Sequence, residues 1–307
     1  MIGEPLPFTS SGVDCAGRLL LPADVSRPLP TVIMAHGFAA QMSYSLEPFA
    51  RTFQELGCAV FLFDYRGFGE SGGAPREEVH PRRQLDDWSA AIRFVQGLPS
   101  TDPTRTVLWG TSFSGGHVLA AAARFPSVCA VISQVPHTSG LATLRTKSIP
   151  DLIQATARAG WDCARRCVGY PPAWVKVVEW PGRFAAMNTP DAWGGYHSLI
   201  PSGHSWPNRV AARSLLLVPL YSPGAQAGRI RCPTLILGAK EDAITPCKQA
   251  ERTARKIPGG EYAELPGGHF DIYQEPVRSE SLALQKEFLC RRVLHRKDSP
   301  EPPPLTP

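Results

Sequence analysis

Two serines, one aspartate and one histidine carry the side chains that acyl transfer would require. Ser112 and Ser114 stand in the segment 106–125, TVLWGTSFSGGHVLAAAARF, while Asp242 and His269 lie far along the chain. A serine hydroxyl attacks an acyl carbonyl when a histidine removes its proton and an acid orients that histidine. The order serine, aspartate, histidine along the chain is one in which such triads occur. These residues therefore predict nucleophilic acyl-transfer chemistry.

The segment 106–125 reads as a strand, a sharp turn and a helix. A serine in such a turn adopts a strained backbone, so its neighbours must be small enough for strand and helix to approach each other. Ser112 lies between Gly110 and Ser114, and Ser114 lies between Ser112 and Gly116. We favour Ser112 as the nucleophile because it directly follows the strand, and Ser114 is the alternative. The non-catalytic interpretation is that Ser112 merely caps the helix.

The acid and the histidine both follow predicted strands. Asp242 comes after the apolar run 234–238, and His269 lies in a Pro-Gly-Gly-His loop after the run 261–265. A carboxylate at a strand end can reach a histidine in a neighbouring loop and fix its tautomer. Glu241 is the competing acid, and an acid that only begins a helix is the structural interpretation.

A turn after another apolar strand, residues 31–35, could stabilise the oxyanion of an acyl-transfer intermediate. The sequence His36-Gly37-Phe38 would present the backbone N–H of Phe38 to the serine. Phe113, the residue after Ser112, would supply the second N–H. Gly37 is therefore predicted to line the substrate site, although an ordinary glycine turn after a strand has the same appearance.

Composition limits the class of protein. The chain has 307 residues, of which 43% are hydrophobic and 19% charged, as in soluble globular enzymes. Its net charge of +5 is too diffuse to predict nucleic-acid or membrane binding. No apolar run approaches the roughly 18 residues of a membrane helix. The first residues lack the pattern of a secretion signal, so a cytoplasmic location is expected.

The cysteines predict neither a disulfide framework nor a metal site. Eight cysteines are scattered along the chain, several of them in apolar strands. Buried reduced thiols explain this distribution. Cys163 and Cys167 have helical spacing, but no second pair of metal ligands accompanies them.

Strands and helices alternate through most of the chain, which predicts a mostly parallel sheet covered by helices on both faces. The segment 64–73, DYRGFGESGG, contains a formal G-x-G-x-x-G. A dinucleotide-binding turn must open a helix, whereas this segment continues as a loop through Pro75. No nicotinamide cofactor is therefore expected.

The alternation breaks between residues 137 and 221. We accordingly predict a core over residues 1–136 that resumes over 222–294, with an inserted lid at 137–221 and a proline-rich tail at 295–307. The lid is expected to contain a helix over 149–168.

The predicted lid is rich in aromatic residues. It holds five of the seven tryptophans, and a hairpin is expected to pair residues 175–179 with 183–187. Aromatic side chains over the strand ends predict the lining of an apolar acyl pocket. The other interpretation is that each tryptophan only fills the core of the lid. The aromatic residues predicted to bind substrate are Trp161, Trp174, Trp180, Trp193 and Tyr196.

Taken together, these motifs resemble the α/β-hydrolase superfamily. The resemblance covers about residues 8 to 292 and rests on Gly37-Phe38, DYRGFGESGG, GTSFSGG, the acid after a late strand and Gly-Gly-His. It implies the α/β-hydrolase fold and a serine hydrolase that needs no cofactor. The segment DYRGFGESGG resembles the serine-aminopeptidase and dienelactone-hydrolase-like branches.

A narrower resemblance connects the chain to fungal polyketide thiohydrolases and acyltransferases, including brefeldin-type thiohydrolases and the decarestrictine-type lactone cyclase. It rests on GTSFSGGH, on the lid sequence 181–196 and on Pro233. It implies a thioester substrate, released by hydrolysis or as a lactone through an acyl-serine, with the acyl-carrier domain of a polyketide synthase as partner. The alternatives are a general carboxylesterase or aminopeptidase-like hydrolase of small molecules, and a non-catalytic protein of the same fold.

Overall fold

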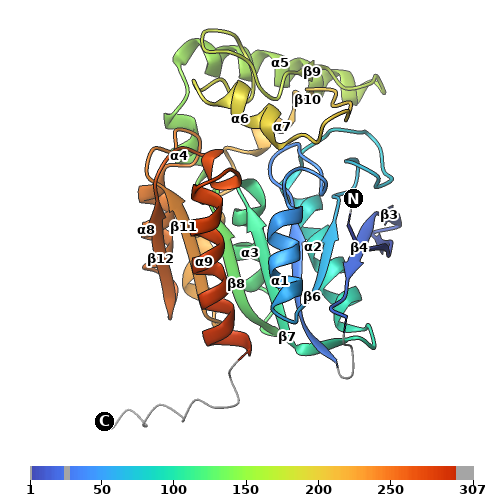
Figure 1. Ribbon diagram of the computed structural model, residues 1–307. Helices are drawn as coiled ribbons and strands as arrows, with labels where there is room; N and C mark the ends of the chain where they lie inside the picture. Colours follow the sequence, from blue (N-terminus) through green and yellow to red (C-terminus); the bar gives the residue numbers. More distant parts are fainter. Residues whose placement is uncertain (1, 24–27, 295–307) are drawn as a thin grey trace.

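The computed structural model describes residues 2–23 and 28–294, and within them an eight-stranded sheet lies between two layers of helices (Figure 1). The order across the sheet is β1-β4-β6-β5-β7-β8-β11-β12. The strands from β6 to β12 run parallel, while β1 and β4 form an antiparallel edge. Their bounds are Glu4–Pro5 (β1), Gly17–Leu20 (β4), Leu29–Ala35 (β5), Ala59–Phe63 (β6), Thr101–Thr111 (β7), Val128–Gln134 (β8), Thr234–Ala239 (β11) and Gly260–Leu265 (β12). A small hairpin, β2 (Phe8–Ser10) and β3 (Val13–Cys15), precedes β4.

Helices cover both faces of the sheet, as the alternating sequence pattern predicts. Helices α1 and α9 contact each other on one face, and α2, α3 and α8 pack on the other. Strands β5 and β6 are buried along their whole length, which explains why they read as continuous apolar runs. The bounds are Glu47–Glu55 (α1), Pro81–Gln96 (α2), Phe113–Ala122 (α3), Cys247–Ala254 (α8) and Val277–Leu289 (α9).

A third group of elements lies across the carboxyl ends of the strands, at the top of Figure 1. These elements fall within the predicted insertion between β8 and β11, and we call them the lid. The predicted helix over 149–168 is confirmed as α5. The lid elements are α4 (Gly140–Arg145), α5 (Ile149–Cys167), β9 (Trp174–Val175), α6 (Ala192–Leu199), β10 (Val210–Ala211) and α7 (Ser214–Leu217).

The hairpin predicted within the lid forms only in part. The Arg183 N–H donates to the Trp180 carbonyl at 3.1 Å, and the Met187 N–H donates to the Val177 carbonyl at 2.8 Å, so the expected turn and some backbone pairing are present. The two segments form no antiparallel ladder, since Val178 makes an isolated parallel bridge with Met187 and strand β9 pairs with β10. Asn208 contributes to this difference, because its side-chain oxygen accepts hydrogen bonds from the N–H groups of Val177 and Val178 at 3.0 and 3.1 Å. Its side-chain nitrogen donates to the Val178 carbonyl at 3.1 Å.

A buried carboxylate joins the parts of the lid. Asp162 of α5 accepts hydrogen bonds from the N–H of Ala173 at 2.7 Å and from the N–H of Arg213 at 2.9 Å. The Arg213 guanidinium lies 3.0 Å from the same carboxylate. A buried charge is tolerated when it is paired and fully hydrogen-bonded. Asp162 therefore fixes α5 against the segments that precede β9 and follow β10.

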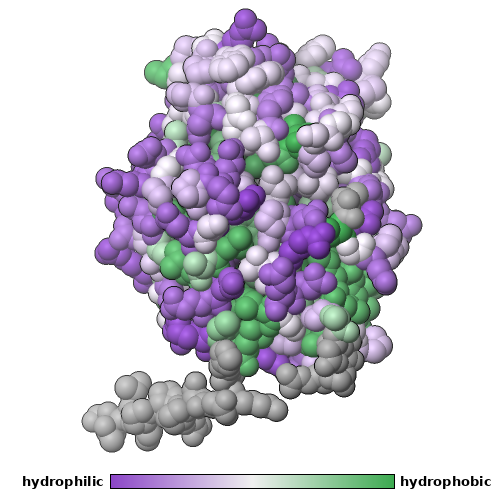
Figure 2. Space-filling view, in the orientation of Figure 1, coloured by the Kyte–Doolittle hydropathy of each residue, from purple (hydrophilic) through white to green (hydrophobic). Residues whose placement is uncertain are grey.

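The surface in the view of Figure 2 carries hydrophilic side chains on both the sheet layer and the lid. Within residues 2–23 and 28–294, no helix combines the length and the apolar character needed to cross a membrane. The predicted proline-rich tail, 295–307, lies outside the described residues.

Candidate active site

Ser112 occupies the sharp turn between β7 and α3. Its backbone has φ 56° and ψ −118°, a conformation that costs a non-glycine residue on the order of 1–3 kcal/mol. Neighbouring backbone holds it there: its N–H donates to the Gln134 carbonyl at 2.8 Å, and its carbonyl accepts from the His137 N–H at 2.9 Å. Gly110 has no room for a side chain, because an added Cβ would lie 2.3 Å from the Ser114 carbonyl oxygen. The strained turn projects Ser112 from the end of the strand.

The structure brings Ser112, His269 and Asp242 into one hydrogen-bonded series. Ser112 Oγ lies 2.9 Å from His269 Nε2, and His269 Nδ1 lies 2.7 Å from Asp242 Oδ2. An ionised carboxylate can only accept hydrogen bonds, so Nδ1–H donates to Asp242. In the neutral ring, Nε2 is then the acceptor for the serine hydroxyl. This tautomer is the one that a general base at Ser112 requires.

Asp242 is held by the turn that it begins. Its Oδ1 accepts from the N–H groups of Ile244 and Thr245 at 2.8 and 2.6 Å, and the Thr245 hydroxyl lies 2.8 Å from Oδ2. Sequence reasoning missed Thr245, although an aspartate two or three residues before such amides is typical of a side-chain-capped turn. The competing acid, Glu241, is exposed and does not take this position. Its N–H instead donates to the Gly267 carbonyl at 2.9 Å.

The alternative nucleophile, Ser114, does not contact His269. Its side chain is fully buried in the first turn of α3, and its Oγ lies 2.7 Å from the Tyr65 hydroxyl oxygen. That oxygen also accepts from Trp88 Nε1 at 2.8 Å. Side chains two positions apart at the start of a helix point in different directions. Ser114 therefore faces the core, while Ser112 faces His269. Ser112 makes no side-chain cap to α3, which also removes the capping interpretation.

The turn at residues 36–38 lies directly against the serine. A Cβ added at Gly37 would lie 3.0 Å from Ser112 Cβ. His36 supports this turn by donating from Nδ1 to the Gly37 carbonyl at 3.0 Å, and burial lowers the pKa of His36 to about 4. Phe113 is the first residue of α3, and N–H groups in the first turn of a helix have no partner within that helix. The rings of Phe38 and Phe113 meet edge to face, with centroids 5.8 Å apart, in the cavity that Ser112 lines. The oxyanion role of their N–H groups stays a prediction.

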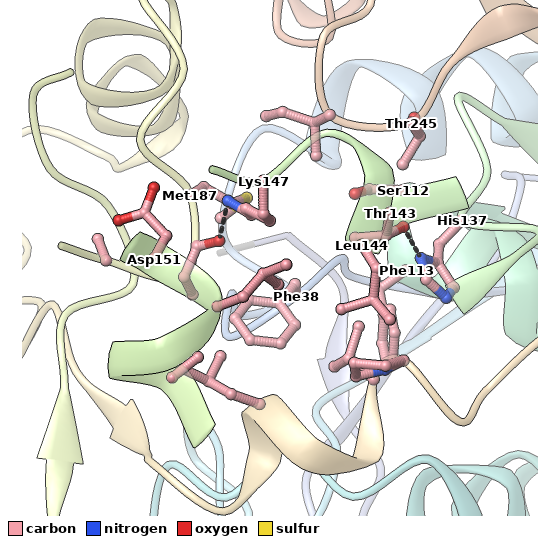
Figure 3. A pocket seen from close by; sticks show the side chains of 18 of the residues that line it. Phe38, Ser112, Phe113, His137, Thr143, Leu144, Lys147, Asp151, Met187 and Thr245 are labelled. Atoms are coloured by element: carbon pink, nitrogen blue, oxygen red, sulfur yellow. Dashed lines mark hydrogen bonds between the residues drawn. The ribbon is translucent and has the colours of Figure 1, made fainter. Parts of the chain in front are cut away.

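A cavity of about 110 Å³ opens beside Ser112 (Figure 3). Its walls are mainly apolar side chains from both the sheet layer and the lid. Such a lining suits an apolar group rather than a charged one. The principal apolar side chains are those of Phe38, Phe113, Leu144, Leu152, Phe184 and Met187.

A smaller cavity of about 20 Å³ lies on the His269 side of Ser112 and includes two residues predicted to bind substrate, Gly37 and Tyr196. Tyr196 is buried, and its hydroxyl donates to the Phe38 carbonyl at 3.0 Å. Its ring stacks on Trp206 with the centroids 4.5 Å apart. Tyr196 therefore supports the turn at Phe38 from the lid side.

The four tryptophans predicted to line the pocket lie outside both cavities next to Ser112. Trp161 is 63% exposed and Trp180 is 52% exposed. Trp193 packs against Trp180 with the ring centroids 5.8 Å apart, and the Arg209 guanidinium covers Trp174 at 4.5 Å. The prediction of a tryptophan-lined roof is therefore wrong.

The phase of α5 explains why Trp161 faces outward. Leu152, Ala155 and Ala159 follow the three-and-four spacing of one helix face. Leu152 and Ala155 line the cavity, and Ala159 is buried. Trp161 falls on the opposite side of α5. Leu152 and Ala155 of α5 thus face the site, while Trp161 faces away from it.

No metal site accompanies this arrangement in the part of the chain that the structure describes, where no three histidine, cysteine or acidic side chains are placed to hold an ion. Cys163 and Cys167 are both exposed on α5.

A comparison of the sequence with known protein families agrees with this geometry. Residues 32–279 match the model of the alpha/beta hydrolase family. The chain belongs to the alpha/beta hydrolase family. This membership confirms the fold expected from the sequence and makes the protein an enzyme of the hydrolase type.

Individual relatives refine the comparison. The chain is 38% identical to the quorum-quenching protein AidA of Acinetobacter baumannii over 287 residues, which are 93% of this chain and 94% of AidA. It is 37% identical to the thiohydrolase aneE of Aspergillus aculeatus over 151 residues, 49% of this chain and 46% of that protein. The alpha/beta hydrolase GrgF from Penicillium superposes with a TM-score of 0.80 at 25% identity, covering 96% of this chain and 100% of GrgF. The resemblance to fungal thiohydrolases is thereby confirmed.

Proposed function

We propose that this alpha/beta hydrolase is a serine enzyme that transfers the acyl group of an ester or thioester through an acyl-Ser112 intermediate. The observation that carries the proposal is the series Ser112–His269–Asp242, with separations of 2.9 and 2.7 Å. A hydroxyl in contact with a correctly oriented imidazole is the arrangement that nucleophilic catalysis requires.

The first half of the reaction forms the acyl-enzyme. His269 Nε2 takes the Ser112 proton while Oγ attacks the acyl carbonyl, and the N–H groups of Phe38 and Phe113 receive the developing oxyanion. Collapse of the tetrahedral intermediate breaks the bond to the leaving group. His269 returns its proton to that group, which departs as a thiol or an alcohol.

The second half removes the acyl group. His269 accepts a proton from a water molecule or a hydroxyl, whose oxygen attacks the acyl carbon. The second tetrahedral intermediate then collapses and breaks the bond to Ser112 Oγ, which regains its proton from His269. Water gives the free acid, and a hydroxyl on the acyl chain gives a lactone. The outcome depends on whether the chain can fold back and on whether water is kept out. Because the tryptophans do not line the site, any exclusion of water depends on other lid residues, among them Leu152, Phe184 and Met187.

The acyl group is proposed to lie in the cavity beside Ser112. Phe38 and Phe113 form its wall on the core side, and Leu152, Phe184 and Met187 close it from the lid. Burying apolar area contributes about 25 cal/mol per Å², so an apolar chain gains affinity there. Release of a polyketide chain from a thioester, including one carried by an acyl-carrier domain, fits this cavity and the similarity to a fungal thiohydrolase.

Breakdown of an acylated signal molecule is the second candidate. It is favoured by the similarity to a quorum-quenching protein over 93% of this chain. The chemistry would be the same, with Ser112 attacking the ester carbonyl. The two candidates differ in the leaving group and not in the catalytic residues.

A substrate panel tests the proposal. Acyl thioesters, hydroxyacyl thioesters, oxygen esters, acylated lactones and N-terminal peptides are incubated with the protein and with Ser112→Ala, and the products are identified by mass spectrometry. Serine-dependent turnover of an acyl substrate is expected. Preferential release of thiol supports chain release, whereas preferential turnover of the lactone supports signal breakdown. A protein that turns over none of them contradicts the proposal.

A further inference from the structure

The apolar cavity beside Ser112 contains one cation. Lys147, in the connection between α4 and α5, lines this cavity together with Asp151 in the first turn of α5. Figure 3 shows both side chains on the side of the cavity away from Ser112 and His137. Two charged groups thus stand where the far part of an acyl chain would lie.

The polar side chains nearer the serine already have partners. Thr245 contacts Asp242, and His137 lies between the Thr143 hydroxyl at 3.1 Å and the Tyr221 carbonyl at 2.9 Å. These groups form the wall and are not free to bind substrate. Lys147 and Asp151 are therefore the charged side chains of the cavity that a substrate can meet.

The Lys147 ammonium retains hydrogen-bonding capacity. It donates to the Ala186 carbonyl at 2.7 Å and makes a long contact of 3.5 Å with the Asn188 side-chain oxygen. An ammonium has three N–H donors, so one donor is left for a further acceptor. Lys147 is partly buried, and this burial lowers its pKa while the Asp151 charge partly opposes the shift.

Asp151 determines which substrate group can accept the remaining hydrogen bond from Lys147. One of its oxygens, Oδ2, accepts from the Ser148 hydroxyl at 2.8 Å and from the Asn188 amide at 3.1 Å. Its negative charge balances that of Lys147 and would repel a carboxylate on the substrate. A hydroxyl, in contrast, can accept from Lys147 and donate to Asp151.

We propose that Lys147 and Asp151 select acyl chains that carry a hydroxyl group away from the reacting carbonyl. The inference rests on the proposed acyl-transfer function and specifies its substrate class as hydroxyacyl esters or thioesters. The apolar wall binds the hydrocarbon part of the chain, and the charged pair distinguishes a hydroxylated chain from an unsubstituted one. Lys147 acts here in specificity and takes no part in the proton transfers at Ser112.

The test compares hexanoyl, 3-hydroxyhexanoyl and 5-hydroxyhexanoyl thioesters of N-acetylcysteamine. Thiol release is measured, because hydrolysis and lactone formation both produce it. We expect kcat/KM to be at least about tenfold higher for the better hydroxyacyl substrate, since hydrogen bonds to charged groups contribute more than neutral ones. Lys147→Met is expected to bring the ratio of kcat/KM between the hydroxyacyl and the hexanoyl substrate close to one.

Lys176→Met is the matched control, because Lys176 is an exposed lid lysine that pairs with Glu179 outside the cavity. It should keep the full preference. Equal values for hexanoyl and hydroxyhexanoyl substrates in the wild type would overturn the inference. An unchanged preference in Lys147→Met, or an equal loss on all substrates, would also overturn it by assigning Lys147 a purely structural role. If the wild-type protein releases no thiol from any of the three substrates, the proposed thioesterase function is contradicted. That result differs from turnover of all three substrates at equal rates, which contradicts only the selection by Lys147 and Asp151.

Discussion

The hydroxyl of Tyr196, in the lid, donates a hydrogen bond to the carbonyl of Phe38, in the turn beside Ser112, at 3.0 Å. The lid therefore supports the proposed oxyanion site and does not only cover it. We expect Tyr196→Phe to lower kcat on an acyl ester by about fivefold to tenfold, since losing one hydrogen bond costs about 1 kcal/mol. Tyr170→Phe, on an exposed lid tyrosine, should leave kcat unchanged. Wild-type kcat in Tyr196→Phe would disprove this supporting role.

The two serines of the turn should behave differently toward a fluorophosphonate probe. Ser112→Ala is expected to abolish covalent labelling and to reduce kcat/KM by at least about a thousandfold. Ser114→Ala should still be labelled, because its Oγ faces Tyr65 and not His269. It should instead lose about 1 kcal/mol of unfolding free energy. Intact-protein mass spectrometry and urea unfolding measure the two effects, and labelling of Ser112→Ala at position 114 would refute the assignment.

The two adjacent acids offer a similar comparison. Asp242→Asn is expected to lower kcat by about a thousandfold or more, because the imidazole loses the acceptor that fixes its tautomer. Glu241→Gln should remain within about threefold of wild type, since its exposed carboxylate does not hold His269. Steady-state kinetics on an acyl ester distinguish the two variants. Comparable losses in both would show that the acid is shared.

Neighbouring glycines of α6 test how tightly the lid packs on the histidine loop. A Cβ added at Gly195 would lie 2.4 Å from the Phe270 ring, whereas one added at Gly194 meets nothing within 4 Å. Gly195→Ala is therefore expected to cost about 1–3 kcal/mol of unfolding free energy and to lower activity, because Phe270 adjoins His269. Gly194→Ala should be neutral or slightly stabilising. Chemical unfolding of both variants checks this, and equal stabilities would contradict the packing.

Buried histidines should make the protein less stable in mild acid. Burial lowers the pKa of His36 and of His137 to about 4 from the usual 6.5. Between these values the unfolded chain binds protons that the native chain does not, so stability falls as pH drops from 6.5 toward 4. Burial raises the pKa of Asp64 to about 6. Burial also raises the pKa of Asp87 and lowers that of His117. The two carboxyls oppose the histidines, because over their own pH windows the native state binds the extra proton.

His137→Gln tests this pH dependence. His137 donates from Nε2 to the Tyr221 carbonyl and accepts at Nδ1 from the Thr143 hydroxyl, so protonation of Nδ1 breaks the second bond. Between pH 6.5 and 4, the unfolding free energy of the variant should decrease less than that of the wild type. The difference between the two decreases should not exceed about 3 kcal/mol, and urea unfolding at each pH measures it. His204→Gln, at an exposed position, should retain the wild-type slope. An identical slope in both variants would mean that the pKa of His137 does not differ between the native and the unfolded chain.

The main features of the fold could be predicted from the sequence because they depend on local patterns. Strands β5 and β11 contain the predicted runs 31–35 and 234–238, since buried parallel strands are continuous apolar segments. The serine turn is equally local, because only small residues permit the close approach of β7 and α3. The lid pairing was missed because Asn208, about 30 residues further along, provides the hydrogen bonds.

The sequence alone determined the residue types available for chemistry, their order along the chain and the strand ends at which they stand. The tertiary structure decided between Ser112 and Ser114 and between Asp242 and Glu241, because one or two residues of helix or turn rotate a side chain toward the site or away from it. The tertiary structure also places Leu152, Met187, Lys147 and Asp151, and none of the predicted tryptophans, along the cavity beside Ser112. The lining of a cavity depends on which faces of distant elements meet, and only the packed chain fixes that.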